Sequence, residues 1–236
     1  MNIKIGSGVF ERFEGYRRAV VLVKGADNRG EDDSLMAKLR AAEADVRERS
    51  DLADYKEIPR IASWREVFRS MGINPNKYPP SVANLIKRTG KGTDLPFVNK
   101  LVCIFNVISL RHMVPCGGDD LSVVTGDLRL DVASGMEDYV PLGKPDVLEH
   151  PDEGEIIYFD DGNRDVFCRA WCWKNGDRSK ITETTTDVAI NVEGMPPVSL
   201  EDLKAIGDEL AEMVREHCGG DVSVHILDDE NDILEI

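Results

Sequence analysis

The chain lacks the segments that place a protein in a membrane or in the secretory pathway. No stretch of its 236 residues reaches the roughly 18 consecutive apolar residues that a membrane-spanning helix needs. Residues 1–18 contain no apolar secretory core. The five cysteines are odd in number and lack the spacing of a disulfide framework, which indicates a reducing compartment. We therefore expect a cytoplasmic protein without a membrane partner.

Basic residues are scarce as well. The chain has 29 Lys and Arg against 44 Asp and Glu, a net charge of −15. A general nucleic-acid binder needs a basic face that displaces counterions, so the composition argues against a DNA partner. Local clusters of cations remain possible contacts for a nucleic-acid backbone, although each cation taken alone is better explained as an ordinary solvated charge. The candidates are Arg88, Lys91, Arg169, Lys174 and Arg178.

The familiar catalytic motifs are missing. There is no G-x-S-x-G, Walker loop, H-E-x-x-H or dinucleotide fingerprint, and none of the four histidines is visibly paired with a Ser or Cys nucleophile. A zinc site could in principle be built from His112, Cys116, Cys168 and Cys172. Strand alternation instead places Cys168 and Cys172 on one face, as small packing residues would be. We expect neither a metal nor another cofactor.

The most informative segment present is an apolar helix that we expect from Leu95 to Met113. Four polar or small residues share one of its faces at i, i+4, i+7 and i+10: Asn99, Cys103, Asn106 and Ser109. Apolar residues fill the rest, so the helix should be buried and its carboxamides need partners, either in an internal hydrogen-bond network or in a site wall. Pro115 ends this helix, and Gly117 and Gly118 allow a ligand to approach the backbone, which favours the site wall.

The remaining pattern predicts one mixed α/β domain over residues 1–236, with helices packed on a sheet. We expect helices at 33–49, from a capping Ser63 to Gly72, from a capping Ser81 to Gly90, and at 199–218. Strands are expected at 19–24, 121–125, 128–132, 155–159, 166–173, 187–192 and 221–227. In the strand at 166–173, Trp171 and Trp173 would share a face with Arg169; such a pair is more often core than a stacking platform.

A series of short segments runs in order from about Ile58 to Glu193. They include WRE at 64–66, SVANLIKR at 81–88, GKGTDLP at 90–96, NKLV at 99–102, PCGGDD at 115–120, CRAWCW at 168–173 and SKITETTT at 179–186. Together these segments resemble the editing and tRNA-binding module of bacterial phenylalanyl-tRNA synthetase, and especially the freestanding proteins built from that module alone. The module consists of the third and fourth domains of the beta subunit, and the resemblance marks residues 58–193 as its core.

The resemblance implies a site and a reaction. Asn106 corresponds to the helix asparagine of the family pocket, and Glu193 to the glutamate that lines the aminoacyl pocket. The implied reaction is hydrolysis of a mischarged aminoacyl-tRNA ester, with Asn106 as the catalytic residue that orients water or donates a hydrogen bond. Glu193 would hold the α-ammonium group, and backbone N–H groups near Gly117 would serve the oxyanion. The other expected substrate contacts are Asn99, Pro115, Gly117, Gly118 and Trp173.

Departures from the family pattern leave alternatives open. The synthetase module has a water-positioning histidine where this chain has Gly117, and a glycine pair where this chain has the bulky segment around Cys172 and Trp173. The first hypothesis is a deacylase acting in trans on aminoacylated tRNA. The second is a non-catalytic module that binds tRNA or a small amino-acid-like ligand, and the third is a small-molecule hydrolase unrelated to tRNA.

Overall fold

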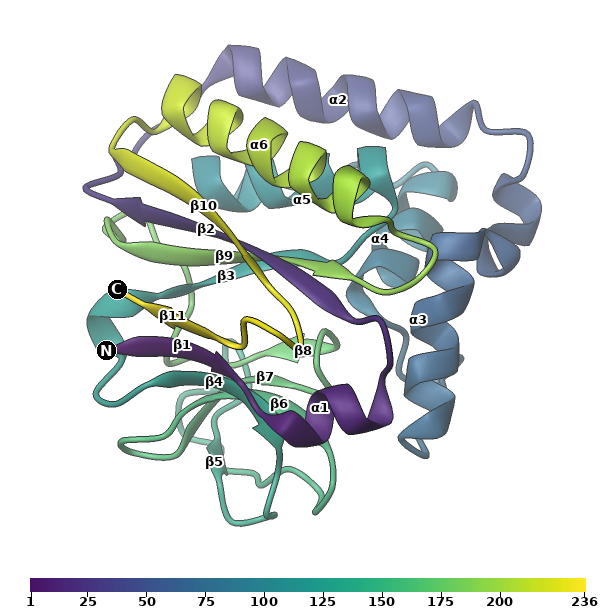
Figure 1. Cartoon of the computed structure of the whole chain (residues 1–236). Helices are drawn as coiled ribbons and strands as arrows, with labels where there is room; N and C mark the ends of the chain where they lie inside the picture. The colour runs from purple at the N-terminus through teal and green to yellow at the C-terminus, as the bar shows by residue number, and fades with distance from the viewer.

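The computed structural model describes all 236 residues. Its helices and two sheets form stacked layers (Figure 1), so the mixed α/β fold class predicted from the sequence is confirmed. The middle layer is a four-stranded antiparallel sheet in the order β10-β2-β9-β3. Its strands are β2 (Arg17–Lys24), β3 (Cys116–Asp120), β9 (Val188–Gly194) and β10 (Asp221–Leu227).

A seven-stranded mixed sheet lies below it in Figure 1, in the order β11-β1-β4-β6-β7-β5 with β8 beside β7. The antiparallel pairing of β1 with β11 brings the two chain ends together. The strands are β1 (Asn2–Ile5), β4 (Leu128–Val132), β5 (Asp138–Tyr139), β6 (Ile156–Asp160), β7 (Asp165–Arg169), β8 (Lys174–Asn175) and β11 (Ile233–Glu235).

Period-two alternation along β9 sorts its side chains between two cores. Val188, Ile190 and Val192 belong to the core under α2 (Asp33–Arg47), α5 (Lys100–His112) and α6 (Leu200–His217), which cover the upper face of the four-stranded sheet (Figure 1). The intervening Ala189 belongs to a second core between the sheets. Asn191 and Glu193 share that inner face, so the alternation places polar groups between two sheets.

The second core is closed by helices at its sides. Phe13, which ends α1 (Ser7–Arg12), and Trp64 of α3 (Pro59–Ser70) both pack edge-on against the buried Trp171. The remaining elements are α4 (Ser81–Gly90) and the short 3-10 turns η1 (Leu52–Glu57) and η2 (Leu121–Val123). No helix has both the length and the apolar character needed to cross a membrane.

Several predicted boundaries were wrong for local reasons. Helix α3 begins at Pro59, whose fixed φ suits a first turn, and so Ser63 lies inside the helix and is not its cap. Helix α4 takes Pro80 as its N-cap, which makes Ser81 the first helical residue. Residues 121–125 form the turn η2 and the residues after it, because Asp120 caps this turn through the Ser122 N–H.

The helix predicted from Leu95 begins later, at Lys100. Asn99 is its N-cap: Oδ1 accepts from the Val102 N–H at 2.9 Å, and Nδ2 donates to the Ile181 carbonyl at 3.1 Å. The Cys103 thiol points to the Leu35 carbonyl of α2. The expectation that this polar face forms a site wall was therefore wrong for Asn99 and Cys103, which have partners elsewhere.

The long strand predicted over residues 166–173 was also wrong. Strand β7 stops at Arg169 because Ala170 and Trp171 adopt left-handed backbone conformations, with φ of 47° and 65°. The chain turns there and returns as β8. The turn sends Trp171 into the core between the sheets and leaves Trp173 half-buried against Tyr78.

The adjacent glycines of β3 should differ in their tolerance of a methyl group. A Cβ at Gly118 would lie 3.0 Å from both the Ala189 carbonyl oxygen and the Phe105 ring, whereas a Cβ at Gly117 would meet nothing within 4 Å. We expect Gly118→Ala to lower the free energy of unfolding by about 1–3 kcal/mol, the usual range for overpacking. Gly117→Ala should be close to neutral. Urea unfolding of both variants tests this, and equal stability would contradict the packing of α5 on β3.

Candidate functional site

A cavity of about 520 Å³ lies at the β3 edge of the four-stranded sheet. Helices α4 and α5 form one wall, and β6, β7 and the β7–β8 turn form the other. The lining residues are Ser81, Asn84, Arg88, Asn106, Pro115, Cys116, Gly117, Gly118, Asp119, Leu142, Tyr158, Cys168, Trp171, Cys172, Trp173, Lys174, Asn175, Asn191 and Glu193. The volume falls within the roughly 300–1,000 Å³ typical of small-molecule sites.

The floor of the cavity is the inner face of β3 and β9. Gly117 pairs with Asn191, and because glycine has no side chain, the space beside it on this inner face is open. Asp119 and Glu193 lie two residues further along their strands on the same face. A bare patch of backbone is thus bordered by two carboxylates and a carboxamide. Gly117 and Gly118 lie in β3, a strand that the sequence pattern did not predict.

Three side chains of the protein donate hydrogen bonds to the Glu193 carboxylate. The Tyr16 hydroxyl donates to Oε2 at 2.5 Å, Trp171 Nε1 donates to the same oxygen at 3.1 Å, and the Tyr158 hydroxyl donates to Oε1. Burial raises the pKa of Tyr16 and Tyr158 well above the ordinary value, so both phenols stay protonated and continue to donate. Glu193 is only 3% exposed. In the structure it is a buried carboxylate that accepts three hydrogen bonds from the protein.

Arg18 balances this anion from β2. Arg18 lies opposite Glu193 in the register of β2 and β9, and its Nη1 donates to the Tyr158 hydroxyl at 2.9 Å. The side chain is fully buried, and Nε and Nη2 have no partner within the protein. Two sheets are therefore joined by one polar relay that runs from Arg18 through Tyr158 to Glu193.

Two carboxamides in the cavity have no partner inside the protein. Asn191 is 4% exposed, and its Oδ1 is buried without a donor. Asn106 of α5 is half-buried and makes no side-chain hydrogen bond. Buried polar groups normally have partners, so these two side chains are open to a ligand.

Asp119 is a carboxyl group whose ionisation is strongly perturbed. Burial raises its pKa to about 7, against the opposing effects of a hydrogen bond from Ser179 Oγ at 2.7 Å and of the Arg18 charge. The neighbouring Glu193 and Asp120 charges raise it further. A carboxyl that titrates near neutrality inside a cavity is suited to proton transfer.

Cations lie at the mouth of the cavity but not at every predicted position. Arg88 on α4 and Lys174 on β8 both line it, and Lys174 Nζ sits 5.7 Å from the Trp173 ring. Lys91 is exposed beyond the end of α4, outside the lining. Arg169 is held by Glu155, with Nη2 to Oε2 at 2.7 Å, and Arg178 pairs with Asp165. The last two cations are therefore engaged by carboxylates of the protein.

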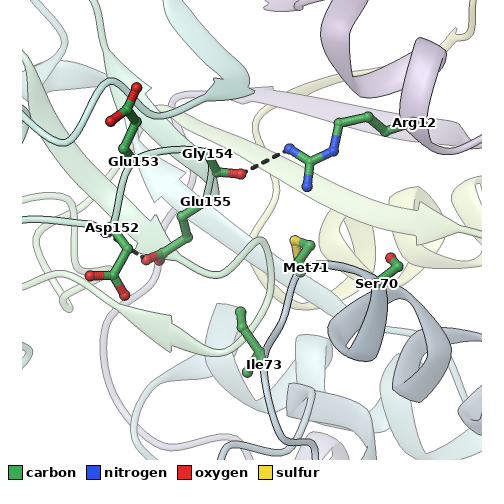
Figure 2. A pocket seen from close by; sticks show the side chains of 8 residues that line it. All are labelled: Arg12, Ser70, Met71, Ile73, Asp152, Glu153, Gly154 and Glu155. Carbon is green, nitrogen blue, oxygen red and sulfur yellow. Dashed lines mark hydrogen bonds between the residues drawn. The ribbon is translucent and has the colours of Figure 1, made fainter.

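A second hollow, of about 490 Å³, is shown in Figure 2. Arg12 donates to the Gly154 carbonyl across it at 2.8 Å, and Glu155 accepts from the Asp152 N–H at 3.1 Å. Glu155 also accepts from the Ala170 N–H and from Arg169. The contacts of Arg12 and Glu155 hold the β5–β6 connection in place, which gives these two polar groups a structural role.

The cysteines and the histidine considered as zinc ligands lie in separate environments: the histidine contacts a glutamate and the cysteines line the cavity. His112 contacts Glu209, with Nε2 to Oε2 at 2.7 Å. Cys116, Cys168 and Cys172 line the cavity, and burial raises the pKa of each thiol above its ordinary value, which keeps them neutral. No group of three or more His, Cys, Asp or Glu side chains is placed to hold a metal ion.

The structure brings most of the predicted site residues together. Those that line one cavity are Asn106, Glu193, Pro115, Gly117, Gly118, Trp173, Arg88 and Lys174. Asn99, Lys91, Arg169 and Arg178 do not line it. Sequence reasoning missed Asp119, Asn191, Tyr158 and Arg18. Asn191 lies two residues before Glu193 on a strand, and that period-two spacing was the one signal that could have revealed it.

A family model described as the B3/4 domain matches residues 63–219. The chain belongs to the B3/4 domain family. Membership confirms the resemblance drawn from the sequence, and it supports a tRNA-related binding role at the level of the family. No curated protein matches the chain.

Among solved structures, this B3/4 protein is similar to an N-terminal fragment of the phenylalanyl-tRNA synthetase beta subunit from Pyrococcus horikoshii. The TM-score is 0.48 and the sequence identity is 12%. The match covers 96% of this chain and 54% of the other, so this chain spans about half the length of that fragment.

The pH dependence of stability should report the buried Asp119 carboxyl. Its pKa of about 7 lies above the roughly 3.9 of an unfolded aspartate, so between these values only the folded state keeps the proton. The free energy of unfolding should therefore fall as pH rises from about 4 to 7, by up to about 4 kcal/mol from this group. Relative to wild type, Asp119→Asn should gain stability at pH 8 over pH 5 in urea unfolding. Asp208→Asn, at an exposed site on α6, matches the charge change and should show no such gain.

Proposed function

We propose that this B3/4 protein is a tRNA-binding deacylase that hydrolyses mischarged aminoacyl-tRNA in trans. The observation that carries the proposal is the cavity at the β3 edge, in which partnerless carboxamides and a titratable carboxyl surround a bare glycine. Such an activity would serve translation quality control and would belong in the cytoplasm. It needs neither metal nor other cofactor.

The dimensions and charges of the cavity suit the 3′ end of an aminoacylated tRNA. Its volume of about 520 Å³ can hold an aminoacyl group joined to the terminal ribose. Arg88 and Lys174 at the mouth can contact backbone phosphates, and Trp173 offers a half-buried ring on which a base can stack. Because the chain as a whole has a net charge of −15, we expect tRNA contact to be concentrated near these cations at the mouth.

Ester hydrolysis needs a positioned water, donors for the developing oxyanion and a place for the α-ammonium group. Asn106 supplies a carboxamide for the water or the ester carbonyl. Glu193 was expected to hold the ammonium group directly. Three donors of the protein already hydrogen-bond its carboxylate, which leaves it little capacity for that contact. Its contribution is a fixed negative potential under the cavity floor.

One observation favours the alternative of a non-catalytic binding module. Position 117 is a glycine, whereas the synthetase module that the chain resembles has a water-positioning histidine there. Such a module would bind tRNA or an amino-acid-like ligand in the same cavity without turnover. A deacylation assay separates the two functions directly.

Purified protein should deacylate at least one member of a panel of mischarged tRNAs. Asn106→Ala should lower that rate roughly ten- to a thousandfold, the range for loss of a positioned donor. Gly117→Ala should also lower it, because its methyl group would enter only ligand space, while the fold is kept. Thermal unfolding provides the control for both variants. A wild-type protein without activity on any tRNA would retire the deacylase in favour of the binding module.

Binding of tRNA should weaken steeply with salt despite the acidic composition, because a few phosphate contacts release counterions. Arg88→Ala and Lys174→Ala should each lower the affinity and flatten the salt slope by roughly one phosphate contact. Lys204→Ala removes an exposed cation from α6, in the opposite layer, and should change neither. Filter binding at 50 and 200 mM salt measures all four proteins. Equal losses in all three variants would contradict a contact confined to the mouth.

A further inference from the structure

The floor of the cavity contains a carboxyl group close to a carboxamide. Asp119 on β3 and Asn191 on β9 point from adjacent antiparallel strands to the same inter-sheet face. In the strand register Asp119 lies opposite Ala189 and Asn191 lies opposite Gly117, so the two are diagonal neighbours. Diagonal neighbours are about 7–8 Å apart at Cα, and the side chain missing at Gly117 leaves the space beside them open.

Each member of the pair has capacity for a ligand. Asp119 uses Oδ1 to accept from Ser179, and no donor of the protein contacts Oδ2. The Asn191 side chain makes no hydrogen bond within the protein, although the residue is only 4% exposed. Rotation about its last side-chain bond can present either the NH₂ group or the oxygen to the cavity. By contrast, both oxygens of Glu193 already accept hydrogen bonds from the protein, so it is the poorer candidate for accepting a proton from water.

We propose that Asp119 is the general base that activates the hydrolytic water and that Asn191 donates a hydrogen bond to the oxyanion. The inference rests on the proposed deacylase function and assigns a general base and an oxyanion donor to that reaction. A water held on Asp119 Oδ2 gives its proton to the carboxylate as its oxygen bonds to the ester carbonyl carbon. Negative charge then develops on the carbonyl oxygen, where the Asn191 NH₂ group donates. As the ester C–O bond breaks, Asp119 returns the proton to the leaving ribose oxygen, and the products are the free amino acid and the deacylated tRNA.

The environment of Asp119 suits this cycle. The charged and titratable groups around it are Arg18 on β2, Glu193 on β9, Asp120 on β3 and Cys168 on β7. Arg18 limits the rise of the Asp119 pKa, while burial, Glu193 and Asp120 raise it, so the carboxylate and the acid are both accessible near neutral pH. An aspartate with the ordinary pKa of about 3.9 would be a weaker base for water.

The test is the pH dependence of single-turnover deacylation on the tRNA that the panel identifies, with spontaneous ester hydrolysis subtracted at each pH. For wild type we expect the rate to rise about tenfold per pH unit below about 7 and then level off. Asp119→Asn should lower the plateau roughly a hundred- to ten-thousandfold and remove the pH dependence. Asp119→Glu, which keeps the base, should restore part of the rate and of the pH dependence.

Two further variants separate catalysis from structure. Ser179→Ala removes the hydrogen bond that lowers the Asp119 pKa, so the midpoint of the profile should move to higher pH while activity persists. Asn191→Ala should lower the rate roughly a hundred- to a thousandfold and leave the midpoint in place. Circular dichroism and tRNA affinity should be unchanged in both.

The outcomes distinguish this inference from the proposed function. An active wild type with an unaltered profile in Asp119→Asn overturns the base and keeps the deacylase. A Ser179→Ala midpoint that does not move, in an active enzyme, assigns the titration to another group and overturns the base as well. Full activity of Asn191→Ala overturns the oxyanion donor. A wild type inactive on every tRNA overturns the function and this mechanism together.

Discussion

The negative charge of Glu193, buried between two sheets, is the constraint on which the arrangement of the inner layer depends. Burying an unpaired carboxylate costs several kcal/mol, so the surrounding elements must supply charge and donors. Arg18 comes from β2, Tyr16 from the residues before it, Tyr158 from β6 and Trp171 from the β7–β8 turn. Donors from both sheets thus converge on one anion, and that convergence fixes how the sheets face each other.

The contacts of Trp171, one of the donors to Glu193, explain why the chain tolerates a strained turn after β7. Ala170 and Trp171 adopt left-handed backbone conformations that non-glycine residues seldom occupy. The strain sends the Trp171 ring between Phe13, Tyr16 and Trp64 and points its N–H to Glu193. Aromatic packing and one buried hydrogen bond offset the backbone cost.

The elements set by local pattern could be read from the sequence, and those set by distant contacts could not. Strand β2 and helices α2 and α6 follow from apolar runs, helical periodicity and the Ser199 cap. β3 was missed because its sequence, CGGDD, has no strand pattern and becomes a strand only by pairing with β9. The helix at 95–113 was predicted too long because an asparagine at the right helical spacing can equally be an N-cap.

The site was predictable in part for the same reason. Asn106, Pro115 and Glu193 could be placed because short motifs carry them in order along the chain. Arg18 lies 140 residues from Tyr158, its hydrogen-bond partner, and no spacing rule connects them. Asp119 is part of the motif PCGGDD, which is visible in the sequence. Its pKa is raised by burial between two sheets and lowered by Arg18, and neither effect is a local property of the sequence.

The edge position of β3 adds a feature that side chains alone do not supply. Glu193 N–H donates to the Pro115 carbonyl at 3.0 Å, which makes the pair Pro115–Glu193 a hydrogen-bonded one. By antiparallel alternation the pair Gly117–Asn191 is hydrogen-bonded too, and the Gly118 N–H is directed away from β9. Because β3 has no further neighbour in its sheet, that N–H lies on the open edge beside the cavity. The backbone donor expected near Gly117 is therefore the N–H of Gly118. Strand β3 thus combines an open face at Gly117 with a backbone N–H at its edge that β9 does not use.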